Sequence, residues 1–484
     1  MGTLQPGQNC WRIERANRAR VIVDAADYFA TIRQAMLNAK HRIFLIAWDF
    51  DTRIKLSNGR KKRGEPPAEL GAFILWLADR TPGLEIKILI WNLGALKILG
   101  RGSSIITAAR WALHNQIKFK FDSAHPPACS HHQKIVVIDD SFAVCGGIDI
   151  TSDRWDTCDH IDDDPRRKGP NGKVYEPWHD TTMVVDGPAA SALAALGRAR
   201  WRNANDEELA PCEPGSDPWP DELEPQFREV DIAIARTVAR HGDLEEVREI
   251  EKLYLDQIAA AKHFIYAENQ YFASPKIADA IAKRLCEPHP PEIILVNPLS
   301  AHGWLEQVAM DSARSQLVRS IGAQAPKGQF VIYTPETAAG GPIYVHAKLM
   351  IIDDQVLRIG SSNMNNRSLG LDSECDLIID CSDIQNDPAC AAIRRLRLGL
   401  LAEHCGLAIE DVERVLDRNP AMTALIDAQT GVGRKLVRLA LPDLGAAEQF
   451  VADNELMDPE SAEELFEPFA KRGLFRQRKK LGAP

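Results

Sequence analysis

The chain has 484 residues, of which 45% are hydrophobic, and it is long enough for two or three domains that each bury a core. Its net charge of −10 argues against general electrostatic binding of nucleic acid, because such proteins normally present a basic face, although a local basic groove stays open. No apolar run approaches the roughly 18 residues that span a bilayer, and the opening MGTLQPGQNCWRIERANRAR lacks the apolar core of a secretory signal.

The first part of the chain alternates predicted helices and strands. A helical pattern over residues 28–37 is followed by Ala-Lys-His and a strand within 38–50. A short apolar run over 84–91 suits a buried strand, and residues 179–202 have the pattern of a strand followed by a helix. This alternation predicts α/β layers with a mostly parallel or mixed sheet.

The same order of patterns returns in the second part of the chain. A helical pattern over 253–259 precedes Ala-Lys-His and a strand within 260–272, and further matching patterns follow at 291–298 and 373–404. Residues 210–225 between the two parts are rich in proline and acidic residues, as in an exposed connection. We therefore predict an N-terminal half over 1–210, a linker over 211–230, a C-terminal half over 231–440 and a tail over 441–484.

Ten cysteines are scattered along the chain without a Cys-x-x-Cys pair or a Cys/His ligand spacing. The sequence therefore predicts neither a zinc site nor a disulfide framework, and we expect a reduced compartment. Cys145 and Cys381 lie in apolar, strand-like runs, where we expect them to be small buried side chains.

One short motif occurs once in each half. SHHQKIVVIDDSFAVCGGID (130–149) and YVHAKLMIIDDQVLRIGSSN (344–363) both contain His-x-Lys-x4-Asp with a later glycine at the same interval. A single match is expected about 0.2 times by chance in a chain of this composition, so one copy means little and two copies exclude coincidence. The residues are His132, Lys134, Asp139 and Gly146 in the first copy and His346, Lys348, Asp353 and Gly360 in the second.

The histidines and lysines of the two copies suit a site for a phosphate diester. Residues two apart in a strand share a face, so each pair would present an imidazole and an ammonium group together, which suggests an anion site. One neutral histidine can attack phosphorus while a protonated histidine gives a proton to the leaving oxygen, and Lys134 and Lys348 can stabilise the phosphoryl oxygens. Shared framework without catalysis is the alternative explanation of the repeat.

Each catalytic imidazole needs a carboxylate that fixes its orientation. Aligning the strands that follow the motifs pairs Asp180 with Glu374, and we predict these two as the orienting acids, although either could be an ordinary polar residue at a strand edge. Asp139 and Asp353 end their strands, and we expect them to hold turns rather than to contact phosphate.

These residues resemble the phospholipase D superfamily. Its signature His-x-Lys-x4-Asp-x6-Gly-Ser-x-Asn is matched in full by HAKLMIIDDQVLRIGSSN, which includes Ser361 and Asn363. The first copy ends in GGID, so Gly147 and Asp149 stand in place of Ser and Asn, as is usual in the branch that resembles eukaryotic phospholipase D. HHQK, GGIDITSDRWD, PWHD, YAENQYF and NNRSLGLDSE also look like motifs of that branch, and the resemblance covers roughly residues 20–410.

The resemblance implies a fold and a reaction. It implies two similar α/β/α sandwich halves that form a pseudo-dimer, with the active site at their interface, and it assigns His132 as nucleophile and His346 as acid and base. It implies cleavage of phosphatidylcholine-like phospholipids to phosphatidic acid, or transfer to another alcohol, without a metal or cofactor. Asn363 would contact phosphate, and Asp149 is a weaker candidate for the same role. Trp155, Trp178 and Tyr271 could meet the lipid, or could equally pack in the core.

The partners that follow are a phospholipid membrane surface and a water or alcohol acceptor, with no nucleic acid, and we expect a monomer. The expected location is cytoplasmic or peripheral to a membrane, with signal-independent export also open. The rival activities are a phosphatidyltransferase like cardiolipin synthase, a nuclease of the same fold, and a catalytically silent lipid binder.

Overall fold

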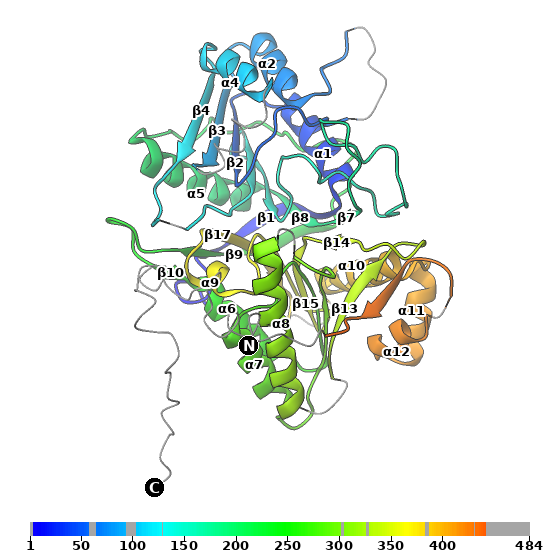
Figure 1. Cartoon of the computed structure of the whole chain (residues 1–484). Helices are drawn as coiled ribbons and strands as arrows, with labels where there is room; N and C mark the ends of the chain where they lie inside the picture. The colour runs from blue at the N-terminus through cyan, green and yellow to red at the C-terminus, as the bar shows by residue number, and fades with distance from the viewer. Residues whose placement is uncertain are drawn as a thin grey trace.

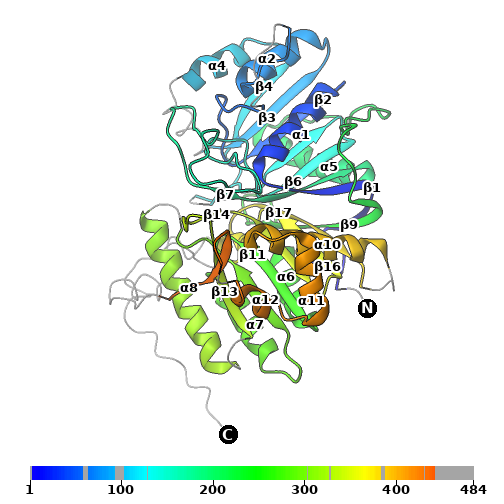
Figure 2. The same cartoon turned by 90° about the vertical axis from the view of Figure 1, so that its right-hand side faces the viewer.

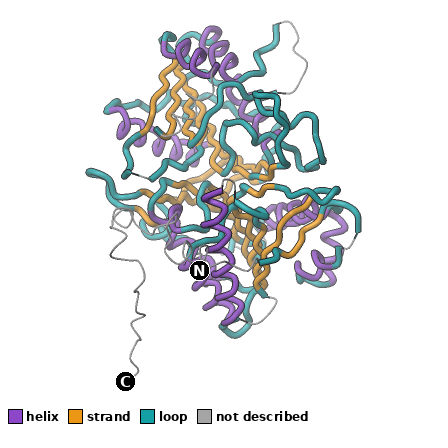
Figure 3. Tube along the Cα trace, in the orientation of Figure 1, coloured by secondary structure: helices purple, strands orange, loops and turns teal. Residues whose placement is uncertain are grey.

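The computed structural model describes residues 3–441, apart from 58–63, 93–102, 128, 302–303, 326–328, 383–386 and 430. All but the first residue of the predicted tail, 441–484, lies outside the described residues. The described chain folds into one large mixed sheet with helices on both sides (Figures 1 and 3). The expected α/β fold class is thereby confirmed.

The first half contributes seven strands to the sheet and four described helices. The strands are β1 (Arg12–Val23), β2 (Arg42–Ala47), β3 (Glu85–Trp91), β4 (Ile117–Asp122), β5 (Ile135–Ile138), β6 (Phe142–Gly146) and β8 (Thr181–Asp186). The helices are α1 (Ala25–Leu37), α2 (Leu70–Arg80), α4 (Ser103–Ala112) and α5 (Gly187–Asn205).

The second half repeats this set and extends it. Its strands are β9 (Phe227–Val238), β10 (Val247–Arg248), β11 (Phe264–Asn269), β12 (Glu292–Val296), β13 (Phe330–Glu336), β15 (Lys348–Ile352), β16 (Val356–Gly360), β17 (Glu374–Asp380) and β18 (Lys435–Arg438). Its helices are α6 (Glu249–Ala260), α7 (Pro275–Leu285), α8 (Trp304–Gln324), α9 (Asn366–Gly370), α10 (Pro388–Cys405), α11 (Ile409–Arg418) and α12 (Met422–Asp427).

The strand order repeats about the middle of the sheet. It runs β4-β3-β2-β5-β6-β8-β1 through the first half and continues β9-β17-β16-β15-β11-β12-β13-β18 through the second. The two halves are joined where β1 pairs with β9 in antiparallel register, with Ala16 opposite Val230. A sheet within each half was expected, but the halves share one continuous sheet because these two strands pair across the junction.

Three large apolar cores among the described residues hold the layers together. One core packs α5 and α10 on the same face of the sheet and runs across both halves. On the opposite face, α1 and α2 cover the first half, and α6 and α7 cover the second (Figure 2). Because helices lie on both faces, central strands such as β2 (RIFLIA) are buried at every position.

Local signals in the sequence set several of the element ends. Helix α10 begins with Asp387, whose side chain accepts the Ala389 N–H, followed by Pro388 at the first helical position. It ends at Gly406, which adopts the left-handed conformation. Strand β9 begins at Phe227, so it overlaps the end of the predicted linker over 211–230.

The expectation that the cysteines form no disulfide framework fails at one pair. Cys381 is buried, as expected, but it forms a disulfide with Cys390 across the connection from β17 to α10. Cys145 is a buried free thiol, as expected. Within the described ranges, no helix combines the length and the apolar character needed to cross a bilayer.

Candidate active site

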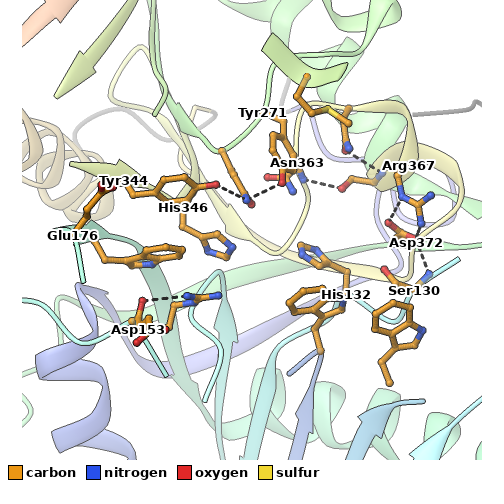
Figure 4. Close-up of a pocket in the computed structure, with 18 of the residues that line it drawn as sticks. Ser130, His132, Asp153, Glu176, Tyr271, Tyr344, His346, Asn363, Arg367 and Asp372 are labelled. Carbon is orange, nitrogen blue, oxygen red and sulfur yellow. Dashed lines mark hydrogen bonds and ion pairs between the residues drawn. The ribbon is translucent and has the colours of Figure 1, made fainter. Parts of the chain in front are cut away.

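The two motif histidines lie at the junction between the halves. A cavity of about 660 Å³ opens there, and both His132 and His346 line it. Their rings face each other across this cavity (Figure 4). Beside the junction, β7 (Trp178–His179) and β14 (Tyr344–Val345) form a short parallel pair that links the halves.

The main chain of each histidine is held by the opposite half. His132 donates its backbone N–H to Ser373 O at 2.9 Å, and His346 donates its own to His179 O at 2.8 Å. These contacts explain a departure from the sequence prediction, which placed the histidines within strands. Both histidines precede their strands, since β5 begins at Ile135 and β15 at Lys348.

The side chains of the histidines are also held crosswise. His132 Nδ1 lies 2.9 Å from Glu374 Oε1, and His346 Nδ1 lies 2.7 Å from Asp180 Oδ2. Each predicted orienting acid therefore contacts the histidine of the other half. A carboxylate at Nδ1 fixes the ring and leaves Nε2 on the cavity side.

Close packing holds these carboxylates in place. Glu374 accepts hydrogen bonds from the hydroxyls of Ser361 and Ser368. Asp180 accepts the Thr181 backbone N–H at 2.8 Å and packs against Gly147, where a Cβ would lie 2.1 Å from Asp180 Oδ1. A glycine is therefore required at the position where the first motif copy departs from the signature.

The other motif glycines also allow close approach. A Cβ at Gly146 would lie 2.4 Å from the Cα of Thr182, and one at Gly360 would lie 1.9 Å from Asp376 Oδ1. Both glycines sit at the ends of equivalent strands, β6 and β16. They let the neighbouring strand pass directly beside the motif, and the orienting acid lies at the start of that strand as Glu374 in β17, or immediately before it as Asp180 before β8.

The two lysines are buried and do not line the cavity. Lys134 donates to His132 O at 2.8 Å and lies 3.3 Å from Asp149 Oδ2. Lys348 donates to His346 O and to Gln270 Oε1 at 3.0 Å. Their positive charge lies within the site, and Gln270 connects Lys348 to the cavity wall.

Burial and neighbouring charges shift the pKa values of these groups. Burial and the charges of Lys134 and Lys348 lower the pKa of His132 well below its usual value, which favours the neutral imidazole. The pKa of His346 is lowered in the same direction by burial and by Lys348. Burial lowers the pKa of Lys348 to about 7.

The two carboxylates shift in the opposite direction. Burial raises the pKa of Asp180 to about 7, against the charge of Lys348. Burial also raises the pKa of Glu374 well above its usual value, and Lys134 together with the two serine hydroxyls acts against that rise.

The motif aspartates lie away from the cavity and hold equivalent turns. Asp139 accepts the backbone N–H groups of residues 40–42, and Asp353 accepts those of residues 262–264, at 2.7–2.8 Å. These are the two Ala-Lys-His segments and the residues that follow them. Each aspartate thus fastens the start of the neighbouring strand, β2 or β11.

The remaining predicted residues divide into two groups. Asn363, Trp178 and Tyr271 line the cavity, and Asn363 Oδ1 has no hydrogen-bond partner among the described residues. Asp149 and Trp155 do not line it. Asp149 is buried beside Lys134, and Trp155 packs against the core of the first half.

The sequence prediction missed several residues of the cavity wall. Arg154 lies with its guanidinium carbon 4.0 Å from the ring centre of Trp178, and Arg367 forms an ion pair with Asp372. Tyr344 stacks on Trp178 with ring centres 4.5 Å apart. Arg154, Arg367 and Asp372 belong to the segments GGIDITSDRWD and NNRSLGLDSE, so the motifs pointed to them although they were not chosen individually.

The chain is similar to several known proteins. Residues 254–389 match a family model described as "Cardiolipin synthase, PLD-like domain". The chain is 25% identical to phospholipase D A of Dictyostelium discoideum over 80% of this chain and 35% of that protein. It is 26% identical to phospholipase D1 of Saccharomyces cerevisiae over 82% of this chain and 29% of that protein.

These relatives are much longer than the chain, which spans about a third of each. Among solved structures, phosphatidylserine synthase of Haemophilus influenzae has a similar fold, with a TM-score of 0.54 and 14% identity. That similarity covers 87% of this chain and 97% of the other. The architecture of both halves is therefore shared with a protein of known structure.

Proposed function

The chain is a member of the phospholipase D superfamily, and from that premise we propose that it hydrolyses the distal phosphodiester bond of glycerophospholipids such as phosphatidylcholine. The products are phosphatidic acid and the headgroup alcohol. One observation carries the proposal: two imidazoles face each other across a single cavity, and each is held at Nδ1 by a carboxylate.

The first step forms a covalent intermediate. Nε2 of neutral His132 attacks phosphorus, the bond from phosphorus to the headgroup oxygen breaks, and His346 gives its proton to that oxygen. Glu374 accepts the Nδ1–H of His132 and so keeps the lone pair on Nε2. The assignment of His132 rather than His346 as nucleophile follows the family resemblance.

The second step releases the intermediate. His346, now neutral, takes a proton from water as the water oxygen attacks phosphorus, and the bond from phosphorus to His132 breaks. An alcohol in place of water gives a transferred phosphatidyl product. Lys134 and Lys348 supply positive potential to the phosphoryl oxygens throughout, and Asn363 is placed on the cavity wall to donate a hydrogen bond to them.

The cavity wall suits a lipid headgroup. Trp48, Trp91, Trp178, Tyr271 and Tyr344 line it, and aromatic faces attract quaternary ammonium groups such as choline. The partners in this proposal are a phospholipid membrane surface and a water or alcohol acceptor. The protein acts in the cytoplasm or at the periphery of a membrane.

A phosphatidyltransferase is the second candidate. The description of the family model that matches residues 254–389 names cardiolipin synthase. The same two steps, with the hydroxyl of a lipid as the acceptor, would give a phosphatidyl-transfer product such as cardiolipin. The two activities differ only in the acceptor that reaches the phosphohistidine.

One experiment tests the proposal against its rivals. Purified protein is incubated with vesicles of phosphatidylcholine or phosphatidylglycerol, and with single-stranded DNA, in buffer containing ethanol. We expect phosphatidic acid and phosphatidylethanol from phosphatidylcholine, with both products at least about 100-fold lower in His132→Ala. The matched control is His263→Ala, which removes an exposed imidazole from the second Ala-Lys-His segment.

Each other outcome contradicts the proposal. Cardiolipin as the main product from phosphatidylglycerol would indicate a transferase, and cleaved DNA would indicate a nuclease. Unchanged lipid cleavage in His132→Ala would refute the mechanism.

A further inference from the structure

A second group of histidines and carboxylates lies behind His346, away from the cavity. Asp24 follows β1, His160 lies in the loop before β7, His179 lies in β7, and Glu403 projects from α10 of the other half. All four are buried or nearly so, and none of them lines the cavity. The group therefore lies between the halves, near the β7–β14 pair (Figure 2).

Four distances between the histidine nitrogens and the carboxylate oxygens of this group lie near the edge length of a tetrahedron around a small ion, with Asp24 presenting one oxygen to each histidine. His179 Nδ1 lies 2.9 Å from Glu403 Oε1 and 3.3 Å from Asp24 Oδ1. His160 Nε2 lies 3.2 Å from the same Glu403 oxygen and 3.7 Å from Asp24 Oδ2. Bonds of about 2.0–2.1 Å from zinc to nitrogen or oxygen place tetrahedral ligand atoms about 3.3–3.4 Å apart.

Hydrogen bonding within the described chain does not account for every atom of this group. His179 Nδ1 and Asp24 Oδ2 are buried and make no hydrogen bond of good geometry among the described residues, although Glu403 Oε1 lies 2.9 Å from His179 Nδ1 and His160 Nε2 lies 3.7 Å from Asp24 Oδ2. A buried polar atom without a hydrogen bond destabilises the folded state. An ion at the centre of the group would engage both atoms.

The far sides of both imidazole rings are held as in metal sites. His160 Nδ1 lies 2.9 Å from Asp156 Oδ2, and His179 Nε2 lies 2.8 Å from Glu268 Oε2. Ligating histidines usually donate their other N–H to a carboxylate, which fixes the tautomer and aims the remaining nitrogen at the metal. Here that remaining nitrogen is Nε2 of His160 and Nδ1 of His179, and both face Asp24 and Glu403.

We propose that Asp24, His160, His179 and Glu403 bind one Zn²⁺ ion that fastens the two halves together. Two imidazole nitrogens and two carboxylate oxygens suit zinc, whereas magnesium and calcium prefer sites made of oxygen alone. Four protein ligands complete a tetrahedron, which is typical of a structural site rather than a catalytic one. The sequence predicted no metal because these ligands come from separate segments and share no spacing motif.

The ion would affect the active site by fixing the positions of the residues that hold Asp180 and His346. Asp24 Oδ1 accepts the backbone N–H of Asp180 at 3.2 Å, and His179 O accepts the backbone N–H of His346 at 2.8 Å. Asp180 and His346 form one of the two crosswise pairs. The metal site would therefore hold this pair in register while Glu403 ties it to the second half.

Metal content tests the proposal without reference to catalysis. Full-length protein from zinc-supplemented medium is freed of loose metal by gel filtration, and its metals are measured by mass spectrometry. We expect about one zinc per chain in the wild type and less than about 0.1 in His160→Gln and Glu403→Gln. The matched control is His131→Gln, which changes a buried histidine paired with Asp122 and should keep the zinc.

Two further measurements do not depend on the variants. X-ray absorption at the zinc edge should show only nitrogen and oxygen neighbours at about 2.0–2.1 Å, without sulfur at about 2.3 Å. Removal of the metal by a chelator should lower the unfolding temperature, and added zinc should restore it.

The contrary results are equally definite. The proposal would be overturned if the wild-type protein contained no stoichiometric metal and its unfolding temperature did not change when zinc was added. It would also be overturned by a sulfur-bound zinc, another divalent ion in its place, or ligand variants that retain as much zinc as His131→Gln.

Discussion

Replacing Glu374 by glutamine tests the role of the crosswise carboxylate. Glu374 is buried, accepts the Nδ1–H of His132, and receives the hydroxyl protons of Ser361 and Ser368. Both oxygens of Glu374 lie close to His132 Nδ1, at 2.9 and 3.1 Å, so in Glu374→Gln an amide NH₂ takes one of these places beside the ring. That NH₂ donates to Nδ1 and moves the ring proton to Nε2, where it blocks the lone pair that attacks phosphorus.

The size of the effect follows from this change of tautomer. The same exchange of carboxylate for amide behind a catalytic histidine costs about 10⁴ in rate in serine proteases, or about 5 kcal/mol at 1.36 kcal/mol for each tenfold. We expect kcat of Glu374→Gln to fall by about 10³–10⁴. KM should change little, because Glu374 does not line the cavity.

The assay separates chemistry from binding and from folding. Initial rates of phosphatidic acid release give kcat and KM, and rapid quenching with phosphorus-labelled lipid follows the acid-labile phosphohistidine. The control is Glu249→Gln, which removes the charge of another largely buried carboxylate, one that pairs with Arg236 outside the cavity. A Glu374→Gln variant that forms phosphohistidine at the wild-type rate, or whose kcat is within tenfold of wild type, would refute the reasoning.

Three other predictions follow from the site. Gly147→Ala places a methyl group against Asp180 Oδ1, so kcat should fall by at least about 100-fold in a folded protein, and unaltered kinetics would count against the packing described. The pH profile of kcat/KM should be bell-shaped. Its acid limb should lie well below 6.5 because the lowered pKa of His132 keeps the nucleophile neutral, and activity should fall on the alkaline side as His346, whose pKa is also lowered, and Lys348, whose pKa is about 7, lose their protons; a flat profile from pH 5 to 9 would contradict these assignments. Asp139→Ala removes an acceptor of three backbone N–H groups and should lower the free energy of unfolding by about 2–4 kcal/mol in urea titrations, whereas a loss under about 0.5 kcal/mol would show that the turn does not depend on it.

The sequence was sufficient for the repeated core but not for its junction. Buried strands such as IVVI in β5 are continuous apolar runs, and the segments that precede β2 and β11 repeat Ala-Lys-His, so these elements were recognisable. Strands β1 and β9, which join the halves, were not predicted. Their segments RIERANRARVIV and FREVDIAIARTV carry charged residues on the outward face, which obscures the apolar run of a strand.

The sequence predicted most residues of the candidate site but not which carboxylate contacts which histidine. Aligning the halves identified Asp180 and Glu374 as equivalent positions, but a repeat gives no sign of which histidine each acid reaches. That depends on how far each strand end extends past the junction, which is a property of the packed sheet. Asp149 shows the same limit, because its place in the motif suggested the cavity and its ion pair with Lys134 places it behind the cavity wall.

The crosswise arrangement makes the junction part of the site. Each histidine takes its orienting carboxylate and its backbone acceptor from the other half, so neither half contains a complete pair. A relative shift of about 1 Å between the halves would lengthen both hydrogen bonds at once, and errors of that size are enough to cost about 100-fold in rate. The continuous sheet through β1 and β9, and the buried histidine and carboxylate group beside β7, both restrict that shift. The two halves of this chain can therefore hold both imidazoles against one phosphate only if the junction between the halves is as rigid as the core of a domain.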